Sequence, residues 1–166
     1  MFQTMLGFAR RHIILFGVAK FSVGVFVGFV FGIYFLPVLI AQDGLDQATL
    51  AELQSKVQRS GEFRRDLAGS DSFHWGEGRV MINDRRVWLD GKVSPGPDYR
   101  LYLTPQFVDD EAGFLAIKNS SRQIGPIRAF SNFSLMLPED VDASRYPAIL
   151  IWCEAFGEFI TTAELK

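Results

Sequence analysis

The sequence predicts a mainly β protein: an antiparallel β-sandwich with one short helix, preceded by a single N-terminal transmembrane helix. Two observations carry this prediction. Residues 21–41 form an uncharged apolar run, and from Gly61 onward short alternating runs are separated by glycine, proline and aspartate. Six to eight short strands at this spacing are typical of an antiparallel sandwich or a small barrel, rather than of alternating strands and helices.

The apolar run over 21–41, FSVGVFVGFVFGIYFLPVLIA, is long enough to cross a bilayer, because about 20 apolar residues in a helix span the hydrocarbon core. The apolar character begins near Ile13, and the ammonium of Lys20 can reach the membrane interface. A cleaved signal sequence has an apolar core of about 7–15 residues and ends in small residues. The longer run, with Leu39 at the site where cleavage needs a small residue, favours an uncleaved signal anchor over 13–41.

Charges on the two sides of the anchor predict its orientation. Arg10, Arg11 and Lys20 lie toward the N-terminus, whereas Asp43 and Asp46 follow the anchor. Positively charged flanks stay in the cytoplasm. We therefore expect a cytoplasmic segment over 1–12, an anchor in the cell (inner) membrane, and a C-terminal region in the periplasm or outside the cell.

Three glycines within the anchor, Gly24, Gly28 and Gly32, are spaced four residues apart. This spacing places them on one helix face, where a second helix can approach closely. Glycine is also common in membrane helices without such a role. If the face is used, a homodimer and a different membrane protein are both allowed as partners.

Composition excludes several classes of function. The chain has 166 residues and a single cysteine, which excludes an internal disulfide, a four-cysteine zinc or iron–sulfur site and a C-x-x-C-H haem attachment. Residues 42–166 contain 14 basic and 19 acidic residues, which gives a net charge of −5. This balance does not fit a nucleic-acid surface or a polybasic membrane patch, so we expect no nucleic-acid partner.

Helix signals appear twice after the anchor. Residues 42–60 carry leucines near a helical repeat, with Asp46 as a plausible N-cap and Gly61 as a plausible stop, and we interpret them as a helical stalk. A short helix is expected over 109–119, since acidic residues at its start suit the helix dipole. The strands are expected within a β domain over 61–166, at 79–83, 86–93, 99–105, 122–129, 131–137, 147–156 and 157–163.

The strand expected at 147–156 contains the only cysteine, Cys153. Its alternation places Ile149, Ile151 and Cys153 on one face, and Trp152 and Glu154 on the other. A strand that is apolar on both faces is covered on both sides. Glu154 is the exception, and it needs a partner if it is buried.

Several segments of the chain together resemble the DM-thirteen domain family. The resemblance covers roughly residues 61–166, and it is carried by the following stretches: FHWGEGRV (73–80), VSPGPDYRLYLTP (93–105), QIGPIRAF (123–130) and FSLMLPEDVDASRYPAILIWCEAFGEFITTAEL (133–165). The most specific feature is the Gly-Pro-Asp turn followed by the Ile-Trp-Cys run.

The resemblance implies a DOMON-like β-sandwich with a role in electron transfer or oxidative chemistry at the cell surface. It implies that Cys153 is the redox residue, that Asp98 is the acid of the Gly-Pro-Asp motif, and that His74 is the histidine near the start of the domain. In animals the domain occurs beside haem-binding DOMON domains and b-type cytochromes. This chain has no haem-ligating segment, so a haem or another redox cofactor is expected on a partner.

Each candidate residue also has a purely structural interpretation. Cys153 is equally consistent with a buried core residue, Asp98 with a turn residue, and Trp152 with a core aromatic. His74 with Cys153 and either Asp98 or Glu154 could in principle bind a metal, but a single surface histidine is the simpler interpretation and we expect no metal.

The function predicted from the sequence is therefore a membrane-anchored redox or electron-transfer component centred on Cys153. The chain has no G-x-S-x-G, G-x-x-x-x-G-K-[ST] or G-x-G-x-x-G motif, which disfavours a stand-alone enzyme of those classes. The alternative is a non-catalytic binding module or an accessory subunit of a membrane protein complex.

Overall fold

The computed structural model describes residues 12–166 and divides the chain into two compact units, one ending at Leu36 and one running from Pro37 to Lys166. The first unit holds most of helix α2 (Ile13–Leu39). The second unit holds every other element among residues 12–166. The expected cytoplasmic segment 1–12 lies, apart from His12, outside the described residues.

The second unit contains eight strands and a few short helices, with the following bounds: α3 (Gln47–Gln54), β1 (Arg59–Phe63), β2 (Gly76–Ile82), β3 (Arg86–Val93), β4 (Tyr99–Thr104), α4 (Glu111–Ile117), η1 (Lys118–Ser120), β5 (Arg122–Pro126), β6 (Ser134–Met136), η2 (Ala143–Arg145), β7 (Ala148–Cys153) and β8 (Glu158–Glu164).

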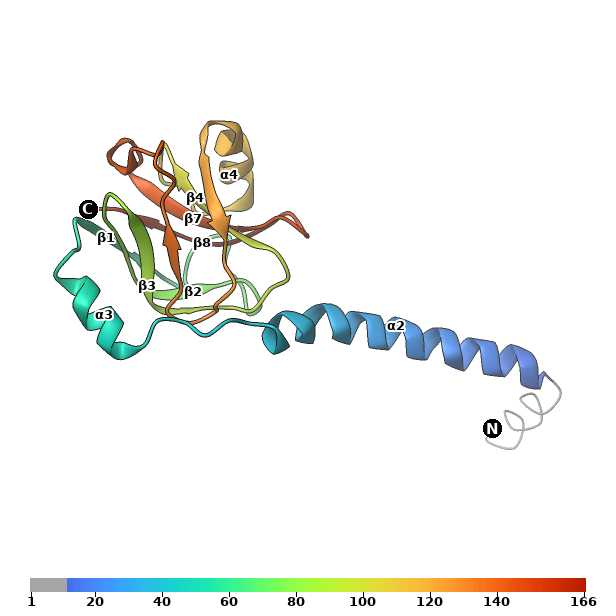
Figure 1. Ribbon diagram of the computed structural model, residues 1–166. Helices are drawn as coiled ribbons and strands as arrows, with labels where there is room; N and C mark the ends of the chain where they lie inside the picture. The colour runs from blue at the N-terminus through green and yellow to red at the C-terminus, as the bar shows by residue number, and fades with distance from the viewer. Residues whose placement is uncertain (1–11) are drawn as a thin grey trace. The chain divides into compact units, whose positions relative to one another are not determined.

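The eight strands form two four-stranded antiparallel sheets (Figure 1). The first sheet has the order β1-β2-β3-β6, and the second has the order β5-β4-β7-β8. The predicted antiparallel sandwich with a preceding apolar helix is confirmed. The small barrel that the strand spacing also allowed is not formed.

The main core lies between the sheets and follows from the alternation in the sequence. Strands β2 and β3 contribute Val80, Ile82, Val87 and Leu89 to this core, and the second sheet contributes Leu101, Leu103, Ile149, Ile151 and Cys153. These side chains are buried almost completely. At about 25 cal/mol per Å² of apolar surface removed from water, this layer is the main stabilising feature of the sandwich.

The outer faces of the sheets are also covered. On the first sheet, Trp88 and Met81 pack against Leu50 and Leu53 of α3. On the second sheet, α4 lies over β4 and β7, with Phe114 buried in the contact (Figure 1). A strand that has a second layer on each side reads as apolar throughout, which is why the run at β7 does not alternate.

The helix expected over 42–60 is shorter than predicted. Asp46 is its N-cap, as predicted, and accepts a hydrogen bond from the backbone N–H of Thr49 at 2.7 Å. The helix ends at Gln54, however, and Gly61 does not stop it but lies within β1. The backbone N–H of Leu45 donates to the carbonyl of Asn132 at 2.8 Å, so this segment is attached to the sandwich rather than standing apart from it.

Helix α2 has the length and apolar composition that crossing a membrane requires. Its candidate span is Ile13–Ile33, which lies near the N-terminus, and a signal sequence would have the same properties. Apart from the backbone of the helix itself, no described residue comes within 4 Å of the place that a Cβ would take at Gly24, Gly28 or Gly32. The glycine face is therefore open to a second helix.

Gly78 and Gly91 lie directly opposite each other in β2 and β3, and we predict that Gly78→Ala destabilises the domain. Gly78 has φ +110°, and a Cβ there would come within 2.3 Å of the carbonyl oxygen of Asp90. The expected loss is about 1–3 kcal/mol of unfolding free energy, measured by denaturant titration.

The matched control for Gly78→Ala is Gly125→Ala, another strand glycine, where the nearest atom to an added Cβ is 3.9 Å away. We expect that variant to stay within about 0.5 kcal/mol of the wild type. Equal losses in the two variants would contradict the conformational argument.

Candidate functional site

Cys153 is the last residue of β7 and points into the core between the sheets. Only 2% of its surface is exposed. Tyr99, the first residue of β4, pairs with it across the strands, so both residues lie at the same end of the sandwich. The thiol is therefore part of the closed core, but directly beneath the turn that follows β7.

Two opposing effects act on the pKa of the Cys153 thiol. Burial is the larger one and raises the pKa above the ordinary value of 9.0, because the thiolate loses its hydration. Backbone groups of Phe156, Asp98 and Ala155 act in the opposite direction, but the net shift of the pKa is upward. The resting thiol is thus protonated at neutral pH and shielded from solvent.

Asp98 ends the turn before β4, and the negative charge of its carboxylate is a minor effect that raises the pKa of the Cys153 thiol. Its Oδ1 is 2.7 Å from Arg100 Nη2. Its backbone carbonyl accepts a hydrogen bond from the N–H of Glu154 at 2.9 Å. Asp98 therefore connects the turn after Cys153 to the turn before β4 through its backbone carbonyl. This contact is structural.

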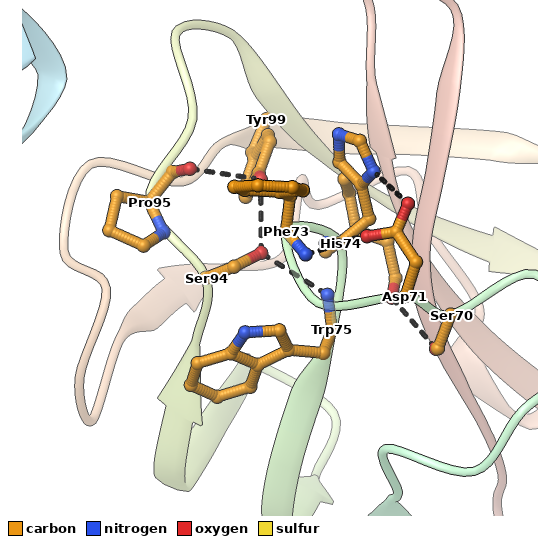
Figure 2. A network of polar contacts seen from close by, with 9 residues as sticks. Ser70, Asp71, Phe73, His74, Trp75, Ser94, Pro95 and Tyr99 are labelled. Carbon is orange, nitrogen blue, oxygen red and sulfur yellow. Dashed lines mark hydrogen bonds and ion pairs between the residues drawn. The ribbon is translucent and has the colours of Figure 1, made fainter. Parts of the chain in front are cut away.

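His74 lies in a loop that Asp71 organises (Figure 2). Asp71 Oδ1 accepts hydrogen bonds from the backbone N–H groups of Phe73 and His74, and Asp71 Oδ2 is 3.0 Å from His74 Nδ1. Burial alone would raise the pKa of Asp71, but these hydrogen bonds lower it overall. The partner of His74 is thus Asp71, and not Cys153, Asp98 or Glu154.

The loop of His74 nevertheless belongs to the same end of the sandwich as Cys153. The backbone N–H of Trp75 donates to Ser94 Oγ at 3.2 Å, and Ser94 Oγ is 3.2 Å from the hydroxyl of Tyr99 (Figure 2). The Tyr99 hydroxyl also donates to the carbonyl of Pro95 at 3.3 Å. This chain of contacts connects the loop at 70–75 to the tyrosine that pairs with Cys153.

Trp152 and Glu154 lie on the other side of the second sheet, beneath α4. Trp152 is buried with Tyr102 and Phe114, and the Phe114 ring centroid is 5.0 Å from that of Trp152 and 5.1 Å from that of Tyr102. Lys118 Nζ is 5.3 Å from the centroid of the Trp152 ring. A cation therefore sits over this aromatic cluster.

Glu154 has the partners that its position requires. Its Oε1 accepts a hydrogen bond from the Tyr102 hydroxyl, and its Oε2 is 2.7 Å from Lys118 Nζ. Burial acts to raise the pKa of Glu154, but Lys118 and Tyr102 outweigh it, so the net shift is downward. The pKa of Tyr102 is raised, first by burial and then by Glu154.

Sequence reasoning did not identify Tyr102, Lys118 or Asp71. Two signals were available: Glu154 needed a partner, and Lys118 lies within the helix expected over 109–119. A third signal was local: Asp71 lies three residues before His74, and an aspartate in a loop commonly accepts hydrogen bonds from the backbone N–H groups that follow it.

The carboxylate of Glu154 makes stability depend on pH, and we predict a smaller acid sensitivity for Glu154→Gln. Because folding lowers the pKa of Glu154, its contribution is complete above the ordinary value of 4.5 and is lost as the pH falls through the folded pKa. We expect the wild-type melting temperature to fall more than that of Glu154→Gln between pH 5 and pH 3. Parallel curves would contradict the assignment.

No group of three or more His, Cys, Asp or Glu side chains within residues 12–166 is arranged to hold a metal ion. The candidate residues thus form two neighbouring arrangements. One is the buried thiol with the turns that cover it, and the other is the Tyr102–Glu154–Lys118 contact on the opposite face of the sheet.

Comparison with known proteins identifies the domain. A family model described as Electron transfer DM13 matches residues 66–165, well over half of the 166-residue chain. Comparisons with curated proteins and with solved structures give no match. The matched span contains Cys153, Asp98, His74, Trp152 and Glu154. The chain therefore belongs to the Electron transfer DM13 family.

Proposed function

We propose that this chain is a membrane-anchored component of an electron-transfer system, with α2 as an uncleaved anchor and the β domain on the non-cytoplasmic side of the cell membrane. The observation that carries the proposal is the match of the folded domain to an electron-transfer family. The long apolar helix at the N-terminus and the positive charges before it support the anchoring and its direction.

Cys153 is the proposed redox-sensitive residue of the domain. Its support is its place at the end of β7, directly before the turn at 154–157 and opposite Tyr99 of β4. Burial raises the pKa of the thiol in the resting domain. In the proposal, the thiol reacts only after the turn at 154–157 has moved: its thiolate attacks a disulfide of the partner, a mixed disulfide forms, and the partner's other sulfur leaves as a thiolate.

The redox cofactor is proposed to reside on a partner in the membrane, as a haem or another one-electron centre. The glycine face of α2 supports helix pairing, because small residues let two backbones approach. A homodimer and a separate membrane protein both fit this face. Gly28→Leu should abolish co-purification of that partner if the face is used, whereas retained co-purification would place the contact elsewhere.

The thiol proposal is tested with Cys153→Ala in the full chain. The readout is the rate at which the partner's cofactor is oxidised and reduced in membranes, and the matched control is Ile151→Val, which removes one methylene from the same core face. We expect Cys153→Ala to fold and to lose electron transfer, while Ile151→Val retains it. A folded Cys153→Ala variant with full electron transfer would overturn the role of the thiol.

A second candidate function, an accessory or binding subunit without its own redox group, is favoured by the open glycine face alone. It predicts that both Cys153→Ala and Ile151→Val are fully active and that Gly28→Leu is inactive. The same set of three variants therefore separates the two candidates.

A further inference from the structure

The strongest unassigned feature is the aromatic cluster under α4. Tyr102 of β4 and Trp152 of β7 are 4% and 1% exposed, and Phe114 of α4 is fully buried between them. Two oxidisable rings thus lie in a dry layer on the sheet that also carries Cys153. In a family of electron-transfer domains, buried oxidisable rings beside charged groups are candidates for one-electron chemistry.

The Tyr102 hydroxyl is hydrogen-bonded to the carboxylate of Glu154, which can accept its proton. The hydroxyl donates to Glu154 Oε1, and its oxygen is also 2.9 Å from Gln123 Oε1, a second acceptor as the amide is placed. One hydroxyl proton cannot satisfy two acceptor oxygens, so the amide of Gln123 is best oriented with its NH₂ group donating to the phenol oxygen. In this orientation the phenol proton points at a carboxylate.

The surroundings of the two rings favour Tyr102 over Trp152 as the residue that loses an electron. Oxidation of an indole leaves a cation until the ring N–H proton departs, and Lys118 already places a positive charge 5.3 Å from the Trp152 centroid. Trp152 Nε1 has no hydrogen-bond partner among the described residues that could take its proton. Oxidation of Tyr102 leaves no net charge on the ring, because the carboxylate takes the proton.

We propose that Tyr102 is a one-electron redox site of this domain, with Glu154 as its proton acceptor and Lys118 as a positioning residue. One electron leaves the phenol ring for a high-potential, metal-centred oxidant held by a partner. The O–H bond breaks, the proton passes to Glu154 Oε1, and a neutral phenoxyl radical and a neutral carboxylic acid result. Reduction by one electron returns the proton from Glu154 to the phenol oxygen.

Two features of the fold suit this step. The proton moves only across one existing hydrogen bond, so no water is needed at the ring. Phe114 and α4 cover the ring, which limits the radical's access to solvent, while Glu154 and Lys118 are each 29% exposed and mark where the cluster reaches the surface. The surface around these two residues is therefore the place where the oxidant approaches.

The test uses the purified full chain in detergent with a photogenerated ruthenium(III) complex as the one-electron oxidant. Radicals are detected by electron paramagnetic resonance and by transient absorption. The variants are Tyr102→Phe and Glu154→Gln, and the controls are Tyr99→Phe and Tyr146→Phe, which remove a phenol hydroxyl elsewhere in the same domain. Lys118→Met completes the set and reports on positioning.

We expect a long-lived tyrosyl radical in the wild type that is lost in Tyr102→Phe and retained in both control variants. Glu154→Gln should slow its formation by about a hundredfold, because a positioned base contributes at least that much, and should remove its solvent isotope effect. A radical retained in Tyr102→Phe would overturn the assignment of Tyr102. An unchanged rate in Glu154→Gln would overturn the role of the carboxylate.

This inference rests on the proposed electron-transfer role, but the two fail in different experiments. The ruthenium oxidant needs no partner, so a wild-type chain that forms no tyrosyl radical at Tyr102 would refute the redox role of Tyr102 and would say nothing against the thiol. A Tyr102→Phe variant that keeps full electron transfer with the natural partner would show that Tyr102 is not needed for that transfer. A partner without a redox centre would refute the proposed function itself.

Discussion

Cys153 in the native protein is expected to react with a maleimide about a thousandfold more slowly than the same thiol in urea. The side chain is 2% exposed, so reaction waits for a local opening of the turn at 154–157. An opening free energy of about 4 kcal/mol corresponds to this factor and lies below the stability of a typical domain.

The measurement is the labelling rate of the full chain by mass spectrometry, at several pH values. Because burial raises the pKa of Cys153, the rate in the folded state should keep increasing with pH above 9.0, the ordinary value for the thiol. Complete labelling of the folded protein within the time needed for the unfolded chain would contradict the closed core. Labelling accelerated by a purified partner would support the movement of the turn that the proposed function requires.

Trp88→Ala is expected to cost about 3–5 kcal/mol of unfolding free energy, the range for emptying a buried aromatic site. Trp88 is fully buried on the outer face of the first sheet, between Met81 and the leucines of α3. The variant removes the contact that fixes α3 to the sandwich. Besides lowering the midpoint of denaturation, it should increase hydrogen exchange over residues 47–54.

Met136→Ala is the matched control for Trp88→Ala. Met136 lies in β6 of the same sheet, but 57% of its surface is exposed, so its truncation should change stability by less than about 0.5 kcal/mol. If Trp88→Ala behaved like Met136→Ala, helix α3 would not be packed on the sheet.

The fold class could be predicted because its determinants are local. The alternation of apolar and polar residues is a property of a single strand and can be seen in the sequence. It placed Val80 with Ile82 and Leu101 with Leu103, and both pairs point into the core. The extent of α3 could not be predicted in the same way. Its leucines fit a helical stripe, but the partner of that stripe is Trp88, which is distant in sequence and on another element.

The site was only partly predictable for the same reason. Strand alternation placed Cys153 and Trp152 on opposite faces, and the structure agrees. Alternation also indicated that Glu154 needs a partner, but it could not name Tyr102 or Lys118, which approach from β4 and from the end of α4. The solvent exposure of Cys153 depends on how the turns at 94–98 and 154–157 cover the end of the sandwich. Strand alternation does not specify the conformation of these turns.

Purification of the full chain from native membranes in a mild detergent tests the central claim most directly. The claim is that this domain passes electrons to or from a cofactor on a membrane partner. We predict a stoichiometric partner whose optical spectrum changes on reduction with dithionite, and whose oxidised cofactor is reduced by the chain more slowly when Tyr102→Phe or Cys153→Ala replaces the wild type. A chain that purifies alone, or with partners that carry no redox-active group, would contradict the account.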